Sequence, residues 1–468
     1  MMNRPPKHPA SRTGTEGSVL ILVIWIIFGL VAITLYFGQT MTFELRASDN
    51  RYSGIEAEQA IEAARRYLSL VLSNDTAPGN LLIAGNFQRE AVPVGNAHFW
   101  LIGRTNTDNA PASVMCWGLV DEASKLNINN ATSNMLIWLP RMTPALLNSI
   151  ITWRSSATNA TAISTGGAES DTYLRLQPPY NAKNSTYETV GELRMIYNMD
   201  MLTLVGEDSN LNGILDPNEN DGETLPPSDN HDGKLDPGLM EYLTVYSHEP
   251  TTMTNGTALL NVAAPTEALR TNMAALFGQQ QADAFLTQAR MLRGGQIQAV
   301  PAITCPLAFY KATGMAQNQF AQLEPYLRGS RTAGLVNVNT ASTTVLTCLL
   351  SGDSATAQQI TSYRAANANN QYNSNSVAWV ANVVTDLNLL VQIGTNITGR
   401  AYQYTADIAA LGHNGRGYRR TKFVFDTVPL VGTNAMPPSI VYRQDLTDLG
   451  WALGKQVRDR WVLGNKIP

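Results

Sequence analysis

A polar leader opens the chain, and an apolar run then extends from Ser18 to Phe43 without a charged residue. In a helix, about 20 such residues match the ~30 Å hydrocarbon core of a bilayer. The leader, residues 1–17, carries three basic residues, and the positive-inside tendency holds such a leader in the cytoplasm. The pattern predicts a transmembrane helix over residues 18–43, with the bulk of the chain on the far side of the membrane.

A helical pattern continues beyond the apolar run. Ala57, Ile61 and Leu68 recur at helical spacing among good helix formers, and the whole segment lacks proline. We therefore expect one continuous helix of roughly 80 Å that ends near Leu72. Residues 44–75 would form its stem outside the membrane.

The period then changes from that of a helix to the alternation of strands. Alternating or apolar segments precede residue 126, and the same pattern returns near the C-terminus around a glycine-rich turn at residues 411–417. We expect an α+β fold in which residues 80–125 and 395–455 form a small antiparallel β domain and residues 126–392 are an inserted α-helical domain. The expected strand segments are 81–83, 97–102, 114–120, 402–408 and 422–425.

An internal repeat occupies the insertion. Residues 126–154 align without a gap to residues 336–364, an offset of 210, and a looser third copy runs from Leu260 to Arg290. Each copy predicts a capped helix, a short turn and a second helix, which is typical of stacked units. The copies resemble helix-hairpin-helix modules, but their turns lack the Gly-apolar-Gly sequence that brings backbone N–H groups to DNA phosphates. With a pI of 5.8, this favours packing or partner binding over nucleic-acid binding.

Composition and charge narrow the picture. With 44% hydrophobic and 15% charged residues, the 468-residue chain is neither disordered nor polytopic. Cys116, Cys305 and Cys348 show no metal-binding spacing, and both one disulfide and buried thiols stay open. The net charge of −4 is unevenly spread, because residues 207–241 hold ten acidic residues against the single basic Lys234. So many carboxylates close together repel one another, so this segment is expected to bind a cation.

The sharpest motif in the acidic segment reads D-x-N-x-N-G-x-x-D-x-x-E and begins at Asp208. This spacing is typical of a calcium loop, in which oxygen ligands alternate around a glycine turn. Gly213 supplies the turn, and Leu215 is expected to fill the core behind the ion; a solvated acidic turn is the alternative. The expected ligands are the side chains of Asp208, Asn210, Asn212, Asp216 and Glu219 and the carbonyl oxygen of Ile214.

A second, poorer loop follows around Gly233. Leu239 stands where the bidentate glutamate of a calcium loop belongs, so Glu241 or an acid from elsewhere would have to complete the site. His231 is expected to be exposed, because calcium prefers oxygen ligands. We thus expect one or two Ca²⁺ ions, the second held by Asn230, Asp232, the Lys234 carbonyl, Asp236 and Glu241.

Catalytic signatures are missing from the sequence. It contains no G-x-S-x-G, HExxH or Walker motif, and its five histidines show no pattern of catalytic partners. We therefore expect that the protein is not an enzyme and has no catalytic residues.

The junction between leader and apolar run, Thr15-Glu-Gly17-Ser18-Val-Leu20, resembles the cleavage site of type IV prepilins and type II secretion pseudopilins. In those families a membrane peptidase cuts after the glycine, so the resemblance assigns processing to Gly17 and Ser18 and implies methylation of the new N-terminus. Leu22 stands at the fifth mature position, where most members carry glutamate and protein K of the type II system does not. An uncleaved signal anchor is the alternative.

Four phrases farther along the chain also resemble the protein K family of type II secretion minor pseudopilins. No single one of these segments is decisive, and the resemblance rests on their order along the chain. It covers most of residues 12–450. The chain is longer than expected for that family, with an extra unit around residues 250–300. The phrases are Asp121–Asn129, Tyr187–Leu193, Tyr242–Tyr246 and Leu335–Ala341.

The resemblance implies a non-enzymatic minor pseudopilin at the tip of the type II secretion pseudopilus, which helps initiate assembly and protein export. It implies a cleaved leader, a single pass through the inner membrane with a cytoplasmic N-terminus and a periplasmic bulk, and an insertion held by calcium. The implied partners are minor pseudopilins of the I and J types, the major pseudopilin and the prepilin peptidase, with no nucleic acid. Two other functions stay open: a membrane-anchored DNA receptor built on helix-hairpin-helix units, and a calcium-dependent surface scaffold or adhesion module.

Overall fold

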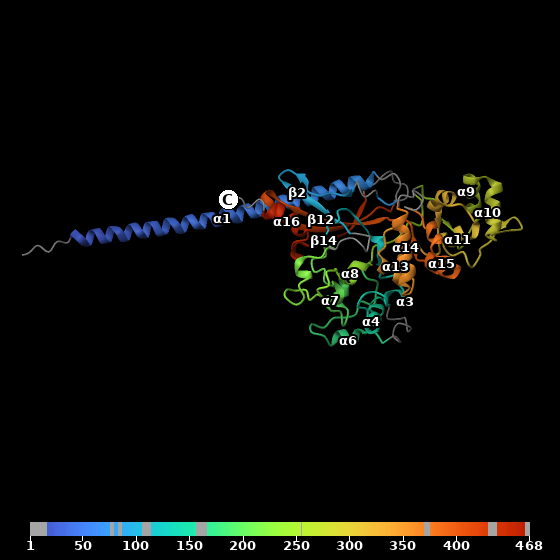
Figure 1. Ribbon diagram of the computed structural model, residues 1–468, viewed down its shortest axis with the longest axis horizontal. Coiled ribbons are helices and arrows are strands. Elements are labelled where there is room, and N and C mark those ends of the chain that lie inside the picture. Colours follow the sequence, from blue (N-terminus) through green and yellow to red (C-terminus); the bar gives the residue numbers. More distant parts are fainter. Residues whose placement is uncertain are drawn as a thin grey trace, which may run out of the picture.

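The computed structural model describes residues 16–74, 79–82, 87–104, 114–155, 166–253, 255–368, 375–428 and 438–463. Its longest element is the helix α1 (Glu16–Ser73), which has 58 residues and a length of about 87 Å. Figure 1 shows α1 as a rod whose first half projects from the head and whose second half lies on the sheet. The predicted continuous helix with an end near Leu72 is confirmed.

One antiparallel sheet forms the body of the head, in the order β1-β2-β12-β13-β14, with β3 also paired to β12. Its central strand β12 pairs with β2, placing Ala409 opposite Trp100, although the whole insertion separates the two strands in sequence. The α+β class, with a sheet interrupted by a helical insertion, is confirmed. The strands are β1 (Val92–Val94), β2 (Ala97–Ile102), β3 (Val120–Asp121), β12 (Gln403–Leu411), β13 (Arg419–Asp426) and β14 (Ser439–Asp445).

Two of the predicted strand segments are wrong. Residues 81 and 82 lie outside any strand, and residue 83 lies outside the described residues. Of the segment 114–120, Val120 belongs to β3 and Trp117 makes an isolated β-bridge to Ile102 of β2, but the segment does not form the continuous strand that was predicted. Gly118 interrupts this segment, because its φ of +147° lies outside the strand region. Hydrophobic alternation alone does not reveal such a break in the backbone.

The inner strands β2 and β12 are buried on both faces of the sheet, whereas the edge strand β14 is mostly exposed. On one face, small residues of α1, Ala57, Ala60 and Ala64, are fully buried and let the helix approach the strands closely. On the other face, Trp100 shares a buried cluster with Leu453 from the segment that follows β14. The stem and the C-terminal segment therefore enclose the sheet between them.

Each aligned copy in the insertion folds as two helices joined by a turn, as predicted, and a short strand that the alignment did not predict precedes them. The arginine that ends each aligned copy makes equivalent bonds, because Arg154 and Arg364 each donate to two carbonyl oxygens of the strand-to-helix turn of their own copy. The two copies are β4 (Leu126–Asn127), α3 (Ser133–Leu136) and α4 (Pro144–Arg154), and β10 (Val336–Asn337), α13 (Thr343–Leu349) and α14 (Ser354–Ala366).

The looser third copy keeps the same plan. Asn127, Asn337 and Asn261 occupy the same strand position in the three copies, and the Oδ1 atom of each accepts the N–H group two residues later at 3.0 Å. Each strand pairs in parallel with a strand from later in the chain. The third copy contains β6 (Leu260–Asn261), α9 (Glu267–Phe277) and α10 (Gln279–Gln288), and the parallel partners of β4, β10 and β6 are β5 (Leu243–Thr244), β11 (Ile397–Thr398) and β9 (Leu327–Arg328).

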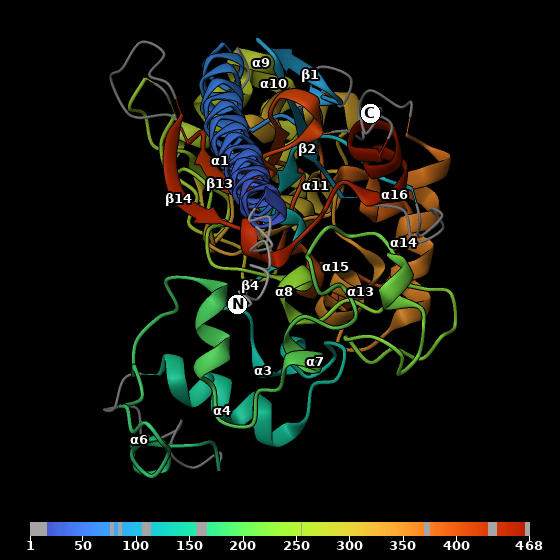
Figure 2. The same cartoon turned by 90° about the vertical axis from the view of Figure 1, so that its left-hand side faces the viewer.

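Figure 2, in which α1 points toward the viewer, shows the part of the insertion with α4, α6 and α7 to one side of the sheet. The helices α9 and α10 lie at the end of the head remote from the rod. The other helices are α6 (Ser170–Leu174), α7 (Met201–Leu204), α8 (Leu239–Tyr242), α11 (Pro306–Thr313), α12 (Gln317–Leu323), α15 (Leu387–Gly394) and α16 (Gly454–Arg458). Shorter elements are the β7–β8 hairpin (Leu292–Arg293, Gln296–Ile297), η1 (Glu122–Ser124), η2 (Val190–Met195), η3 (Pro217–Glu219), η4 (Glu324–Tyr326), η5 (Ala378–Asn382), η6 (His413–Gly415), η7 (Thr447–Leu449) and η8 (Asp459–Leu463).

Candidate functional site

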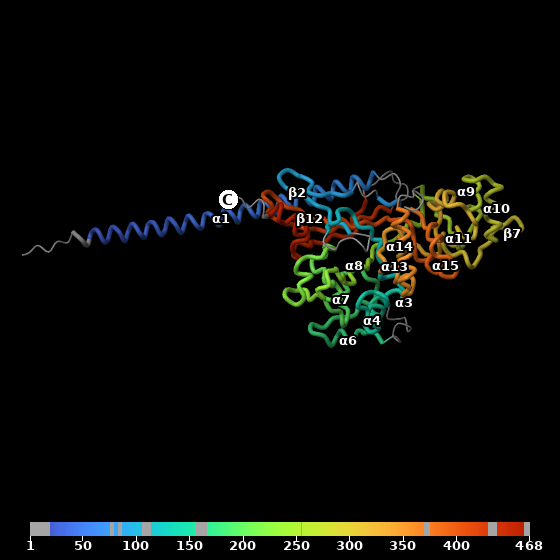
Figure 3. The backbone as a smooth tube through the Cα atoms, in the orientation of Figure 1, coloured from blue at the N-terminus to red at the C-terminus, as the bar shows by residue number. Residues whose placement is uncertain are grey.

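The first half of α1 presents its apolar side chains away from the head. Residues 19–48 are exposed throughout, and Figure 3 shows the first half of α1 clear of every other element. Among the described helices, α1 is the one that is long and apolar enough to cross a membrane. The structure therefore fits a single-pass, membrane-anchored protein.

The predicted processing site lies at the start of α1. Gly17 and Ser18 belong to the helix, but the side chain of Ser18 and all of residues 1–15 lie outside the described part of the chain. Leu22, which stands where most pilins carry glutamate, is 59% exposed on the apolar rod. Cleavage after Gly17 stays a prediction.

Two acidic loops of the insertion follow α7. The first loop (residues 208–219) is buried at all five of its predicted side-chain ligands, whereas the second loop (residues 228–236) is mostly exposed. Both loops follow the sequence pattern described above, so their local geometry decides what they can hold.

The first loop folds around its own side-chain oxygens. The carboxylate of Asp208 accepts the backbone N–H groups of Asn212 and Gly213 at 2.9 and 2.8 Å. The Oδ1 atoms of Asn210 and Asn212 accept the N–H groups of Asn212 and Ile214 at 3.1 and 2.9 Å. Gly213, with a φ of 75°, makes the turn in the left-handed region that favours glycine.

Two further carboxylates close the first loop. Glu219 accepts the N–H group of Ser209 through Oε1 at 2.9 Å and that of Asp216 through Oε2 at 3.0 Å. Asp216 Oδ2 accepts the side-chain N–H groups of Asn210 and Asn212 at 2.7 and 2.9 Å. The structure therefore places all five predicted side-chain ligands in one hydrogen-bonded loop.

Burial makes the carboxylates of the first loop costly to ionise. Asp208 and Glu219 are each 1% exposed, and burial raises the pKa of Asp208 to about 6 and that of Glu219 to about 7. Burial also raises the pKa of Asp216. In the part of the chain that the structure describes, no three His, Cys, Asp or Glu side chains gather as metal ligands do, so amide and carbonyl oxygens would have to complete a cation site here.

The residue that fills the core behind the first loop is Ile214, and the prediction of Leu215 for this role is wrong. Ile214 is 6% exposed and lies close to Gly454 of α16, while Leu215 is only half-buried. The carbonyl oxygen of Ile214 stays a predicted ligand.

The second loop repeats the bonds of the first. Asn230 Oδ1 accepts the N–H group of Asp232 at 2.9 Å, Asp232 Oδ1 accepts that of Lys234 at 2.8 Å, and Asn230 Nδ2 donates to Asp236 Oδ2 at 3.0 Å. The first loop has the same three bonds at equivalent positions. Asn230, Asp232 and Lys234 are exposed, so the expected ligands of this loop are in contact with solvent, whereas those of the first loop are buried. His231 is exposed as well, as predicted.

Glu207 contacts the second loop from outside it. Its Oε2 atom accepts the N–H group of Asp236 at 3.0 Å, and its Oε1 atom accepts that of Asn230 at 3.4 Å. In the first loop, Glu219 holds Asp216 in the same way. Glu207 directly precedes the first loop in sequence, so the sequence gives no sign that it contacts the second loop. The fold brings the two together.

Glu241, the residue first expected to complete the second loop, lies elsewhere. Its Oε2 atom is 3.1 Å from Nε of Arg104, just beyond the end of β2. Burial acts to raise the pKa of Glu241, but the positive charges of Arg104, Lys125 and Lys422 together outweigh it and lower that pKa. Its carboxylate is therefore occupied by an arginine on the sheet side.

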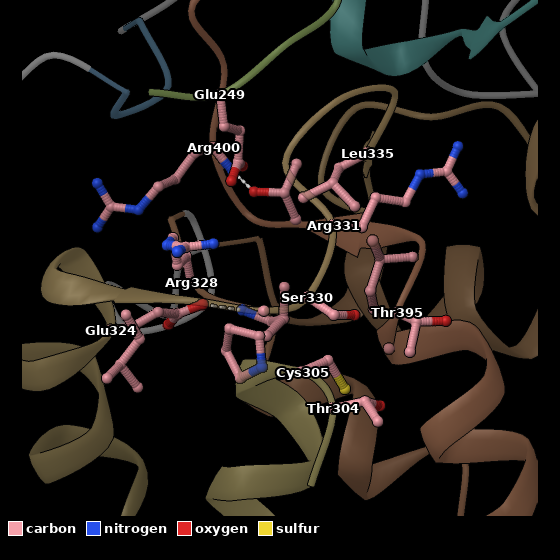
Figure 4. Close-up of a pocket in the computed structure, with 17 residues that line it drawn as sticks. Glu249, Thr304, Cys305, Glu324, Arg328, Ser330, Arg331, Leu335, Thr395 and Arg400 are labelled. Atoms are coloured by element: carbon pink, nitrogen blue, oxygen red, sulfur yellow. Dashed lines mark hydrogen bonds between the residues drawn. The ribbon is translucent and has the colours of Figure 1, made fainter. Parts of the chain in front are cut away.

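A second group of buried charges lines a cavity of about 30 Å³ near β9 and β11 (Figure 4). Among the described residues, Glu249 Oε1, Glu324 Oε2, Arg328 Nε and Thr304 Oγ1 are buried in its walls without a hydrogen-bond partner. Burial raises the pKa of Glu249, and it raises that of Glu324 to about 7. The cavity has room for about two water molecules. No sequence motif points to this cavity.

The three cysteines are unpaired. Cys305 and Cys348 are buried, and Cys116 is half-buried. Burial raises the pKa of the Cys348 thiol to about 12 and also raises that of Cys305. Of the two possibilities left open by the sequence, the structure has free thiols that pack as small hydrophobes.

Together these features define a class of protein. A long helix that is exposed and apolar in its first half and packed on an antiparallel sheet in its second half is the architecture of a membrane-anchored, pilin-like subunit. Here a large helical insertion, with two acidic loops, interrupts the sheet and enlarges the head.

Comparison with known proteins narrows the class. Residues 124–204 match the family model of protein K of the type II secretion system (T2SS), which confirms the predicted resemblance to protein K. No curated protein matches the chain. Among solved structures, the chain is similar to one in the crystal structure of the GspK-GspI-GspJ complex from the enterotoxigenic Escherichia coli Type 2 Secretion System, with a TM-score of 0.38 and 11% identity over 87% of this chain and 99% of that chain.

Proposed function

We propose that this protein is a minor pseudopilin of a type II secretion system and that it acts by assembly rather than by catalysis. The observation that carries the proposal is the division of α1, since residues 19–48 are exposed while Ala57 to Leu72 provide the buried face against the sheet. Such a helix can lie in a bilayer and then pack beside the helices of similar subunits. The match to the protein K family supports the same interpretation.

The proposed position is the tip of the pseudopilus, where the protein would help initiate assembly and export. The insertion extends the head at the end remote from α1, so a subunit stacked above would collide with the lobe that holds α9 and α10 (Figure 1). Leu22 lacks the carboxylate that is thought to neutralise the terminal amine of a neighbouring subunit in related pilins. This is consistent with a subunit that has no neighbour above it.

The proposed partners follow from the resemblance to protein K. They are the I-type and J-type minor pseudopilins in a tip complex, the major pseudopilin below them, and the prepilin peptidase that cuts between Gly17 and Ser18. The proposed orientation places the N-terminus in the cytoplasm, α1 across the inner membrane, and the head in the periplasm.

We also propose that Ca²⁺ holds the insertion in shape. In the first loop the chemistry of the donor set fits a hard cation, because buried carboxylates with raised pKa values alternate with amide oxygens. A bound ion would offset the repulsion between these carboxylates and link folding stability to calcium. The proposed ligands are Asp208, Asn210, Asn212, Ile214, Asp216 and Glu219 in the first loop, and Asn230, Asp232, Lys234, Asp236 and Glu207 in the second.

Co-purification tests the proposed assembly. The full chain, co-expressed with the I-type and J-type minor pseudopilins and the prepilin peptidase, should be recovered in detergent as one complex that contains all three pseudopilins. A chain that elutes alone under these conditions contradicts the proposal. Duplex DNA added to the same preparation should not bind, and an affinity that falls with salt would favour the DNA receptor instead.

A further inference from the structure

Two arginines of the sheet reach across to the first loop. Arg420 of β13 is fully buried, and its Nε and Nη2 atoms donate to the carboxylate of Asp407 on β12 at 2.8 and 2.5 Å. The same guanidinium also turns to the loop, where Nη1 donates to the carbonyl oxygen of Asn210 and Nη2 to that of Leu211, the latter at 2.7 Å. The guanidinium of Arg420 therefore pairs with Asp407 and at the same time binds two peptide carbonyl groups of the loop.

Arg104 approaches the same peptides from beyond the end of β2. Its Nη2 atom donates to the carbonyl oxygen of Leu211 at 2.7 Å and its Nη1 atom to that of Asn212 at 3.1 Å, while Nε faces Glu241. The fit is close, because a Cβ atom on Gly213 would lie 2.7 Å from Cδ of Arg104. Between them, the two arginines hold three consecutive carbonyl oxygens of the loop.

The loop is also tied to the tail segment (residues 451–457) that follows the last strand. Asn210 Nδ2 donates to the carbonyl oxygen of Trp451 at 3.0 Å, and Asn212 Nδ2 donates to that of Ala452 at 3.3 Å. The tail segment in turn covers the face of the sheet opposite α1. The first loop is therefore the point where insertion, sheet and tail segment meet.

This joint depends on the conformation of the loop. A buried guanidinium is costly unless its N–H groups are paired, and the loop offers its carbonyl oxygens to the arginines only while it keeps its turn. Asp208 and Glu219 hold that turn through the backbone N–H groups they accept. Arg104 and Arg420 form their ion pairs with carboxylates outside the loop, at Glu241 and Asp407. The charge of Arg104 also acts on Asp208, so a cation in the loop would share that carboxylate with the electrostatic field of the arginine.

We infer that cation binding in the first loop fastens the insertion and the tail segment to the sheet, and that Arg104 and Arg420 are the positioning residues for this coupling. The inference rests on the proposed calcium site. Coupling of this kind is reciprocal, so the sheet arginines that preorganise the loop must also raise its affinity for calcium.

The test compares the wild type with Arg420→Lys and with the control Arg419→Lys, each as the full chain in detergent. Lysine keeps the positive charge opposite Asp407 but cannot span both loop peptides, whereas Arg419 on the same strand faces Glu58 of the stem. Calorimetry with Ca²⁺ gives the affinity, and hydrogen exchange gives the protection of residues 210–214 and of the tail segment.

We expect Arg420→Lys to bind calcium about tenfold more weakly or worse, as the loss of buried hydrogen bonds from a charged donor predicts. In calcium it should also exchange faster in the loop and the tail segment, while Arg419→Lys matches the wild type in both measurements. If Arg420→Lys does not fold, Arg104→Lys removes the other pair of loop bonds and gives the same comparison.

The possible failures are distinguishable. Calcium affinity and tail protection in Arg420→Lys equal to the wild type would overturn the inference and leave the calcium site in place. The inference also fails if a chelator exposes the loop of the wild type but not the tail segment. A wild type that takes up no calcium would overturn the proposed ion, and the coupling with it.

Discussion

Glu324 allows a prediction whose size follows directly from the structure. Its side chain lies in the wall of the cavity in Figure 4 and is 7% exposed. Oε1 accepts the N–H group of Val377 at 3.0 Å, and Oε2 has no partner among the described residues. Burial raises the pKa of this carboxyl from its usual 4.5 to about 7.

The folded state therefore keeps a proton over a pH range in which the unfolded state has lost it. Below pH 4.5 both states are protonated and the group has no effect, while between pH 4.5 and about 7 the free energy of unfolding falls as pH rises. Above this window the loss is complete and amounts to about 3 kcal/mol. Glu324→Gln resembles the protonated carboxyl at every pH, so it should be more stable than the wild type by about this amount at alkaline pH and equal to it in acid.

Urea unfolding of the full chain in detergent, followed by tryptophan fluorescence at pH 4 and pH 8, measures this difference. Trp379 reports locally, since it lies two residues from the N–H group that Glu324 holds. Glu90→Gln, at an exposed glutamate, is the matched control and should leave both midpoints unchanged. The reasoning is refuted if Glu324→Gln unfolds at the wild-type urea concentration at pH 8, or if its advantage is as large at pH 4.

The other predictions concern the loops and the processing site. Asp208→Ala combined with Glu219→Ala should lower the rise in melting temperature that calcium gives the wild type, because it removes the contribution of the first loop, about 2.7 kcal/mol at a hundredfold excess over Kd; a wild-type melt that chelator never alters would remove the site. Glu207→Gln should weaken the second calcium-binding step several-fold, whereas Glu241→Gln should leave it unchanged, and calorimetry measures both affinities. If Glu241→Gln lowered the affinity and Glu207→Gln did not, Glu241 would be the ligand instead. Gly17→Leu should block cleavage and leave the precursor in the membrane, which immunoblotting detects as a larger product, and normal maturation of this variant would count against a prepilin-type site.

Local features of the fold could be predicted from the sequence. The spacing of Ala57, Ile61 and Leu68 fixed α1, because helical periodicity and the lack of proline are properties of neighbouring residues. The aligned repeat likewise predicted two copies of one unit, and Arg154 and Arg364 close them with equivalent bonds. The turn of the first loop follows from the same kind of local chemistry, since Asx side chains bond to their own backbone.

Contacts between distant segments could not be predicted. Arg420 meets Asn210 across 210 positions of sequence, and nothing near either residue indicates the other. Glu207 contacts the second loop although it precedes the first loop in sequence. The cavity around Glu324 likewise arises where five segments of the chain meet, namely residue 249, residues 304–306, 324–335, residue 377 and residues 394–400. Residues 114–120 do not form the continuous strand that was predicted, because the backbone of Gly118 adopts a positive φ. The hydrophobic pattern of a sequence gives no information about such an angle.

The most direct test of the account is the mass of the N-terminal peptide of the chain, extracted from membranes of cells that also express the prepilin peptidase. A pseudopilin must be released from its leader before α1 can pack beside its neighbours. The account predicts a mature chain that begins at Ser18 and carries a methyl group on its terminal amine. A membrane-embedded chain that still begins at Met1 in the presence of active peptidase would contradict it.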